Sequence, residues 1–129
     1  MATIKRFEDL EIWQEARKLA KDIHQITVNT PLKTDFRFQQ QIKASSGSIM
    51  DNIAEGFERD GNAEFKQYLA IAKGSSGETR SQLYRLLDYG YISEKQFLEL
   101  KIQYESLSGK IQSFITYLNK QEFKGNKFR

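Results

Sequence analysis

Cysteine is absent from this chain of 129 residues, and proline and histidine each occur once. Without a thiol, the chain cannot form a disulfide scaffold, a zinc–thiolate site, an iron–sulfur cluster or a cysteine nucleophile. The single histidine, His24, also excludes any metal site that needs several histidines. No apolar run approaches the roughly 18 residues of a membrane span, and no apolar signal-peptide stretch follows the N-terminus. We therefore expect a cytoplasmic protein without a metal, a cofactor or a membrane partner.

The composition is that of one soluble globular domain. Hydrophobic residues make up 39% of the sequence and charged residues 29%, and the formal net charge is +3,. Most of the positive excess lies in the last ten residues, which include Lys120, Lys124, Lys127 and Arg129. We therefore predict a helical domain over residues 1–121 and a short basic tail over residues 122–129.

Apolar residues recur at intervals of three and four along most of the chain, which is the period of an amphipathic helix. The pattern predicts four helices, over about residues 8–28, 35–57, 63–90 and 93–118, and no strand. The connections between them are short, so consecutive helices should run antiparallel. The predicted fold is all-α, an antiparallel up-down-up-down four-helix bundle.

The last of these helices has the most regular pattern. Ser93 and Gln96 have the spacing of a capping box at its start,. Its apolar residues alternate at intervals of three and four, and they are Phe97, Leu100, Tyr104, Leu107, Ile111, Phe114 and Leu118. This heptad pattern is typical of a left-handed helical bundle, so we expect the seam to form part of the core.

The second helix carries an apolar arc that is wider than one bundle core requires. Seven apolar residues between Phe38 and Phe57 span about half of the helix circumference,. An additional apolar strip on one helix suggests burial against a second chain. We therefore predict a homo-oligomer.

Small residues interrupt the second and third helices, over residues 45–48 and 74–77. A glycine inside a helix costs up to about 1 kcal/mol relative to alanine, so its presence there needs a reason. We interpret Gly47, Gly74 and Gly77 as positions of close helix packing, where the two small-residue stretches face each other.

Three polar residues, Asn52, Glu55 and Glu78, stand out on the second and third helices. They are candidates for a polar network that fixes helix register or subunit contacts. The alternatives are a carboxylate pair for acid–base chemistry and plain exposure to solvent. His24 lies at the flank of the first apolar stripe, near Trp13, so we expect a partly buried structural histidine rather than a catalytic base.

The basic tail allows two interpretations. Its cations either complement the dipole of the last helix as solvated charges, or bind a polyanion. Phe123 and Phe128 lie among these cations, and aromatic side chains interleaved with cations suit single-stranded nucleic acid,. The candidate nucleic-acid contacts are therefore Lys120, Lys124, Lys127 and Arg129, with Lys43 in the body of the chain as a further candidate.

Four stretches of the sequence carry a resemblance to a known family. Residues 41–56 resemble the signature of the four-helix-bundle proteins encoded in intervening sequences of bacterial 23S ribosomal RNA genes, also called S23 proteins. Residues 71–78 match the third-helix motif of that family, and residues 7–13 and 87–92 are similar to its opening and to its third turn. The resemblance extends over about residues 7–118.

The resemblance implies an antiparallel four-helix bundle that assembles into a ring-like pentamer and has no established enzymatic activity. Relatives of the family serve as accessory proteins of diversity-generating retroelements, where they engage reverse transcriptase and nucleic acid. Two positions depart from the family pattern. Ala44 removes the second charge of a basic pair that begins at Lys43, which weakens the case for nucleic-acid binding through this helix. Met50 replaces a proline, which makes the helix more continuous and adds an apolar side chain.

Three functions remain open from the sequence. The favoured function is a non-enzymatic oligomeric bundle that acts as an interaction or adaptor module, with RNA or a reverse-transcriptase-type protein as its partner. The second is a purely structural protein–protein assembly without nucleic acid, and the third is an enzyme with an unrecognised site. No cluster of titratable residues indicates an enzyme, and no feature indicates a small-molecule substrate. Salt-dependent binding to RNA would distinguish the first function from the second.

Overall fold

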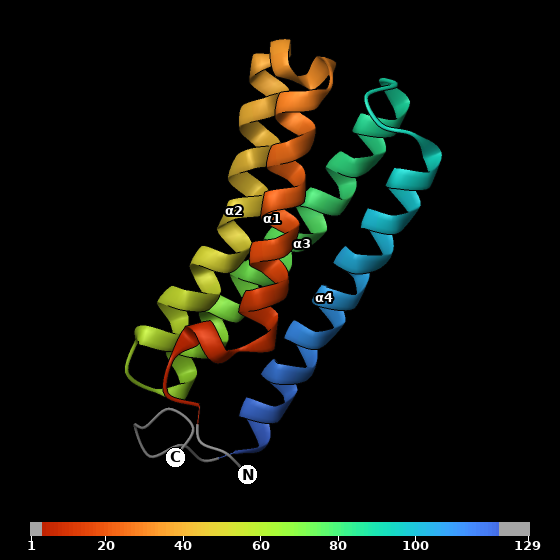
Figure 1. The fold of residues 1–129 in the computed structure, drawn as a ribbon. Helices are drawn as coiled ribbons and strands as arrows, with labels where there is room; N and C mark the ends of the chain where they lie inside the picture. The colour runs from red at the N-terminus through yellow and green to blue at the C-terminus, as the bar shows by residue number, and fades with distance from the viewer. Residues whose placement is uncertain (1–3, 122–129) are drawn as a thin grey trace.

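The computed structural model describes residues 4–121, and their helices run up and down the molecule in turn (Figure 1). Within these residues there is no strand, and the four long helices are α1 (Glu11–Asn29), α2 (Phe36–Glu58), α3 (Asn62–Asp88) and α4 (Glu94–Lys120). Two short 3-10 helices, η1 (Phe7–Asp9) and η2 (Pro31–Thr34), precede α1 and α2. The predicted all-α four-helix bundle is confirmed. No helix of the described residues has the length and apolar content needed to cross a bilayer.

The helix ends follow from the local sequence. Ser93 Oγ accepts a hydrogen bond of 3.1 Å from the Gln96 backbone N–H, and Gln96 Oε1 accepts one of 3.2 Å from the Ser93 N–H, so the predicted capping box is present. Gly90 follows α3 with a φ of +75°, the left-handed conformation that ends a helix,. The first helix begins at Glu11, later than predicted, because residues 7–9 form a separate 3-10 turn.

Two polar side chains differ from what their places in the sequence indicate, because aspartate before a helix favours an N-cap at Asp35 and His24 flanks an apolar stripe,. Asp35 precedes α2, but its side chain does not cap the helix, because its carboxylate accepts a hydrogen bond of 2.9 Å from the Tyr91 hydroxyl. His24, predicted to be partly buried, is exposed. One step along a helix turns the side chain by about 100°, which carries His24 away from the direction of its buried neighbour Ile23,.

The core contains the predicted seam of α4. Six of its seven residues are buried, and the seventh, Phe114, is partly buried with its ring centroid 5.5 Å from that of Phe65. On α2, five of the seven residues of the predicted apolar arc are buried in the same core, and Met50 packs against it. The wide arc of α2 is therefore largely accounted for within one chain, and it does not by itself indicate a second chain.

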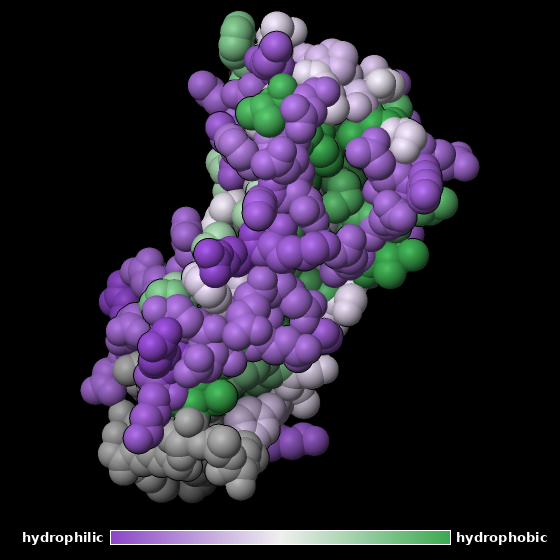
Figure 2. Space-filling view, in the orientation of Figure 1, coloured by the Kyte–Doolittle hydropathy of each residue, from purple (hydrophilic) through white to green (hydrophobic). Residues whose placement is uncertain are grey.

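The helices do not all pack equally closely. Near the start of α1, Lys110 Nζ on α4 lies 2.6 Å from a carboxylate oxygen of Glu15 and 3.2 Å from one of Glu11. Toward the other end of the bundle, α1 and α4 diverge (Figure 1). Figure 2 shows apolar side chains between the polar rows in this region. A groove of about 360 Å³ lies there, and Ile26 and Leu100 are among its lining residues.

The mid-helix glycines do not mark the closest approach of α2 and α3. A β-carbon at Gly47, Gly74 or Gly77 would meet no atom within 4 Å, so the prediction of close helix packing at these three residues is wrong. The close approach is at Gly56, where a β-carbon would lie 2.5 Å from Tyr68 Cβ. The rotation of each helix turns these glycines away from the contact between α2 and α3, where Ser48 and Ser75 meet instead.

Candidate functional site: a hydroxyl-lined groove between α2 and α3

The two stretches that carry most of the family resemblance, residues 41–56 and 71–78, meet on the surface of the molecule. An open groove of about 620 Å³ runs between α2 and α3 at this position. Its lining residues are Gln41, Ala44, Ser45, Ser48, Ser75, Glu78, Ser81, Gln82 and Arg85. Because six of these nine belong to the two stretches, and because most are small or polar, we take this groove as the candidate functional site.

Two serines hold the middle of the groove together. Ser48 Oγ on α2 and Ser75 Oγ on α3 are 2.9 Å apart. Asn52 lies one turn further along α2, and its Nδ2 donates to the Ser48 carbonyl oxygen at 2.8 Å and to Ser48 Oγ at 2.9 Å. The Asn52 side chain is therefore used to orient Ser48 and to tie it to its own helix.

A second set of hydrogen bonds joins buried side chains at the floor of the groove. Thr79 Oγ1 lies 2.8 Å from Ser45 Oγ, and Ser45 Oγ donates to Gln82 Oε1 at 2.6 Å. Thr79 Oγ1 also lies 2.9 Å from the Ser75 carbonyl oxygen, which connects this set to the serine pair. Gln82 Nε2 reaches Glu78 Oε2 only at 3.5 Å, so the exposed Glu78 carboxylate is weakly held at the edge of the groove.

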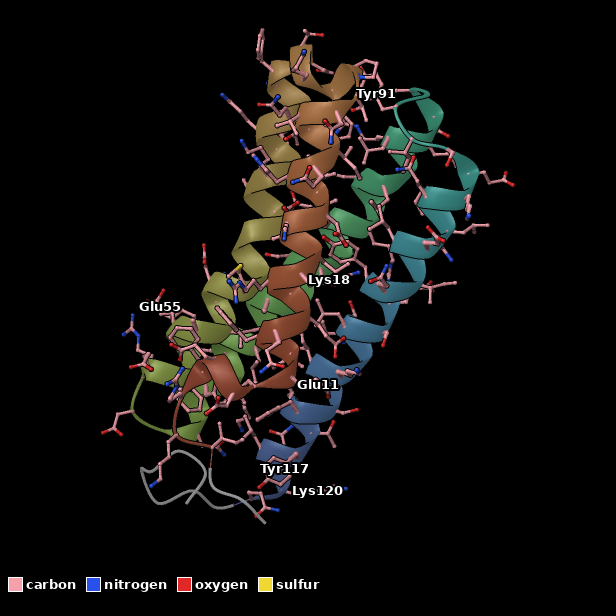
Figure 3. All side chains as sticks on the ribbon, in the orientation of Figure 1. Glu11, Lys18, Glu55, Tyr91, Tyr117 and Lys120 are labelled. Atoms are coloured by element: carbon pink, nitrogen blue, oxygen red, sulfur yellow. The ribbon has the colours of Figure 1, made fainter. Side chains whose placement is uncertain are left out.

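Glu55 lies outside this network. Its carboxylate accepts hydrogen bonds from Arg59 Nη2 at 2.8 Å and from the Tyr68 hydroxyl at 3.2 Å, near the end of α2 (Figure 3). The hydrogen bond from Arg59, followed by that from Tyr68, lowers the pKa of Glu55. The three polar residues singled out in the sequence are thus divided, because Asn52 and Glu78 lie at opposite ends of the groove network and Glu55 belongs to a separate ion pair.

The side chains that line the groove suit a contact surface better than a reaction centre. Glu78 is its one carboxylate. Its one cation, Arg85, lies 4.0 Å from the centroid of the Phe38 ring and donates to Gln41 Oε1 at 3.3 Å. Among residues 4–121, no group of three acidic or histidine side chains is placed to hold a metal ion. The lining hydroxyl and amide oxygens keep spare lone pairs, so a partner surface can still donate hydrogen bonds to them.

The predicted nucleic-acid contacts are dispersed. Lys43 is exposed on α2, in the half of that helix nearer its start, and Lys120 is exposed at the other end of the bundle, where α4 ends (Figure 3). Lys124, Lys127 and Arg129 lie outside the described residues. The described part of the chain therefore does not gather these cations into one site, and binding through the tail stays a prediction.

Sequence reasoning missed Ser81, Gln82 and Arg85 in the lining of the groove, and it missed the hydrogen bond of the buried Thr79 to Ser45. A signal for two of them was present, because residues 75, 78, 82 and 85 recur at intervals of three and four, which places them on one side of a helix,. Polar residues at this spacing are also typical of a solvated helix face. Only the hydrogen-bond partners on α2 show that these residues line a groove and do not form a solvated helix face.

Comparisons with known proteins agree with this architecture. The model of the family described as 23S rRNA-intervening sequence protein matches residues 8–113. A similar solved structure is that of a protein of unknown function from the S23 ribosomal protein family of Bacteroides thetaiotaomicron, with 24% sequence identity and a TM-score of 0.74. The alignment covers 81% of this chain and 95% of that chain. No curated protein matches the sequence. With its family model matched over most of its length, this chain belongs to the 23S rRNA-intervening sequence protein family.

Proposed function

We propose that this protein is a non-enzymatic oligomeric interaction module that assembles through the outer faces of α2 and α3. The observation that carries the proposal is the position of two glycines. Gly47 and Gly74 lie inside helices, where glycine is less stable than alanine by about 1 kcal/mol,. A β-carbon at either position would meet no atom of the same chain within 4 Å. Packing within one chain does not require these glycines, and the same is true of Gly77 and Gly109. Gly47 and Gly74 differ from those two because each directly precedes a serine that lines the groove, where the close approach of a second backbone would require a glycine.

The surroundings of these glycines support the same proposal. Gly47 and Gly74 directly precede Ser48 and Ser75, the hydrogen-bonded pair at the middle of the groove. Ile71 lies three residues before Gly74 on α3 and is 52% exposed. A second copy on this surface would cover the Ile71 side chain, the helix backbones at Gly47 and Gly74, and the open groove in one contact. The ring-like pentamer that the family resemblance implies is the assembly that we propose.

Substitution by leucine tests this interface. We expect Gly74→Leu in the full chain to lower the oligomer mass measured by light scattering after size exclusion, because the new side chain would occupy the space of the second chain. Gly109→Leu is the matched control, because Gly109 is also exposed inside a helix, on α4, and would meet no atom within 4 Å. Equal masses for the two variants would contradict the proposed interface, and circular dichroism verifies that both remain helical.

The partner that we propose for the assembled module is RNA or a protein that processes nucleic acid, such as a reverse transcriptase. Lys43 supports this part of the proposal, since it is exposed and forms no ion pair among residues 4–121. The rival function is a purely protein–protein assembly without nucleic acid. It predicts that the full chain shows no salt-dependent affinity for a labelled RNA, whereas contacts to phosphates make affinity fall steeply with salt.

A further inference from the structure

The exposed charges of α1 differ between its two sides. On the side toward α4, Lys18 is paired with Asp22, with 3.1 Å between the charged atoms. Outside the groove with α4, Lys21, His24 and Val28 are exposed at helical positions i, i+3 and i+7, and Lys21 lies almost opposite the buried residues of α1,. Lys21 forms no ion pair with any described residue. Lys21 therefore presents a cation without an ion pair on the outer surface of α1.

A matching stripe follows α2. Phe36, Gln40 and Lys43 are exposed at positions i, i+4 and i+7, on the side of α2 toward α1,. Because α1 and α2 are antiparallel neighbours connected by the short η2, the two stripes lie on the outer surface of the same helix pair,. We define the α1–α2 face by Lys21, His24, Phe36, Gln40 and Lys43, a set that contains cations, one amide and one aromatic side chain but no acid.

Phe36 gives this face an unusual feature. It is 68% exposed, which is the largest value among the exposed large hydrophobic side chains of the described residues. Lys33 precedes it and Arg37 follows it, and both are exposed and without an ion pair in the described part of the chain. The neighbouring acid, Asp35, accepts a hydrogen bond from Tyr91. An exposed ring among free cations provides base stacking and phosphate pairing at one place.

We infer that the α1–α2 face binds single-stranded nucleic acid, with a base stacked on Phe36 and phosphates contacting Lys21 and Lys43. A single strand fits this face better than a duplex, because a duplex keeps its base faces stacked inside. An anionic membrane fits it less well, because membrane binding grows with the apolar area inserted and the face offers one ring. The inference rests on the proposed nucleic-acid partner and names the site that receives it.

The test measures the fluorescence anisotropy of a short labelled single-stranded RNA titrated with the full chain at low and at moderate salt. We expect Phe36→Ala to weaken binding by about 5-fold to 100-fold, which corresponds to the loss of one stacked base. Lys21→Gln combined with Lys43→Gln should reduce the slope of log affinity against log salt by about 1.4, since each phosphate contact to a single strand contributes about 0.7.

A second pair of lysines provides the matched control. Lys66 and Lys73 on α3 bind the side-chain amide oxygens of Asn119 and Gln112, both at 2.8 Å, so Lys66→Gln with Lys73→Gln removes the same charge from another face. This control should bind the RNA like the wild type. Equal weakening by both lysine pairs would overturn the inference, and so would wild-type binding by Phe36→Ala.

The remaining outcomes separate the site from the proposed function. Binding that survives in the Lys21 and Lys43 variant but is lost when Lys124 and Lys127 are changed to glutamine overturns the α1–α2 face and keeps the nucleic-acid partner. Tighter binding to duplex RNA or to phosphatidylserine vesicles than to the single strand also overturns the inference. The absence of any RNA binding overturns both the inference and the nucleic-acid partner, while the oligomer mass tests the assembly independently.

Discussion

At Gly56 a β-carbon would lie 2.5 Å from Tyr68 Cβ, whereas at Gly77 it would meet no atom within 4 Å. The same residue type therefore permits helix contact at one position and leaves a helix surface bare at another. Sequence spacing does not separate the two cases, because the difference depends on how each helix is rotated about its axis. That rotation is set by the packing of the whole bundle.

Alanine substitution at these two glycines should have opposite effects. We expect Gly56→Ala to lower the free energy of unfolding by about 1–3 kcal/mol, because α3 must shift to make room for the methyl group. Gly77→Ala should raise it by up to about 1 kcal/mol, because alanine is the better helix former and the position is open. Urea unfolding monitored by circular dichroism measures both values. If Gly77→Ala were destabilised instead, this position would be closely packed, as the sequence predicted, and the open position described here would be wrong.

The sequence predicts the positions of the helices closely, but it predicts the contacts between helices only in part. The start of α4 is predicted correctly because Ser93 and Gln96 form a capping box, a local feature of four residues,. The groove is harder, because Asn52 and Glu78 stand out by position whereas Thr79 and Gln82 acquire their role from Ser45, more than thirty residues away. Such long-range partners follow from helix register, which a period of three and four does not define.

The hydrogen bond between Ser48 and Ser75 gives a prediction for the contact of α2 with α3. In a double-mutant cycle with Ser48→Ala and Ser75→Ala, we expect a coupling of about 0.5–1.5 kcal/mol in the free energy of unfolding, the usual contribution of one such bond,. Thermal and urea unfolding of the four variants provide the measurement. Strictly additive effects would show that the two hydroxyl groups do not interact in solution.

The bundle presents different chemistry on different sides. Lys110 and two acids join α1 to α4 at one end, small polar side chains line the groove between α2 and α3, and free cations with an exposed ring lie along α1 and α2. Assembly through the outer faces of α2 and α3 would leave Lys21, His24 and Phe36 open to a partner. Lys43, in contrast, lies four residues before Gly47 on the same side of α2 and would stand at the edge of the assembly interface,. In a ring, several copies of the α1–α2 face would be close together, which raises avidity without any new contact.

The central claim is that the protein works as an assembled module, and the mass of the full chain in solution tests it most directly. Sedimentation equilibrium at several micromolar concentrations gives this mass without a matrix or a label. We predict a mass near 75.5 kDa, which is five times the 15.1 kDa of one chain. A mass of 15.1 kDa throughout the series would show a monomer and contradict the account.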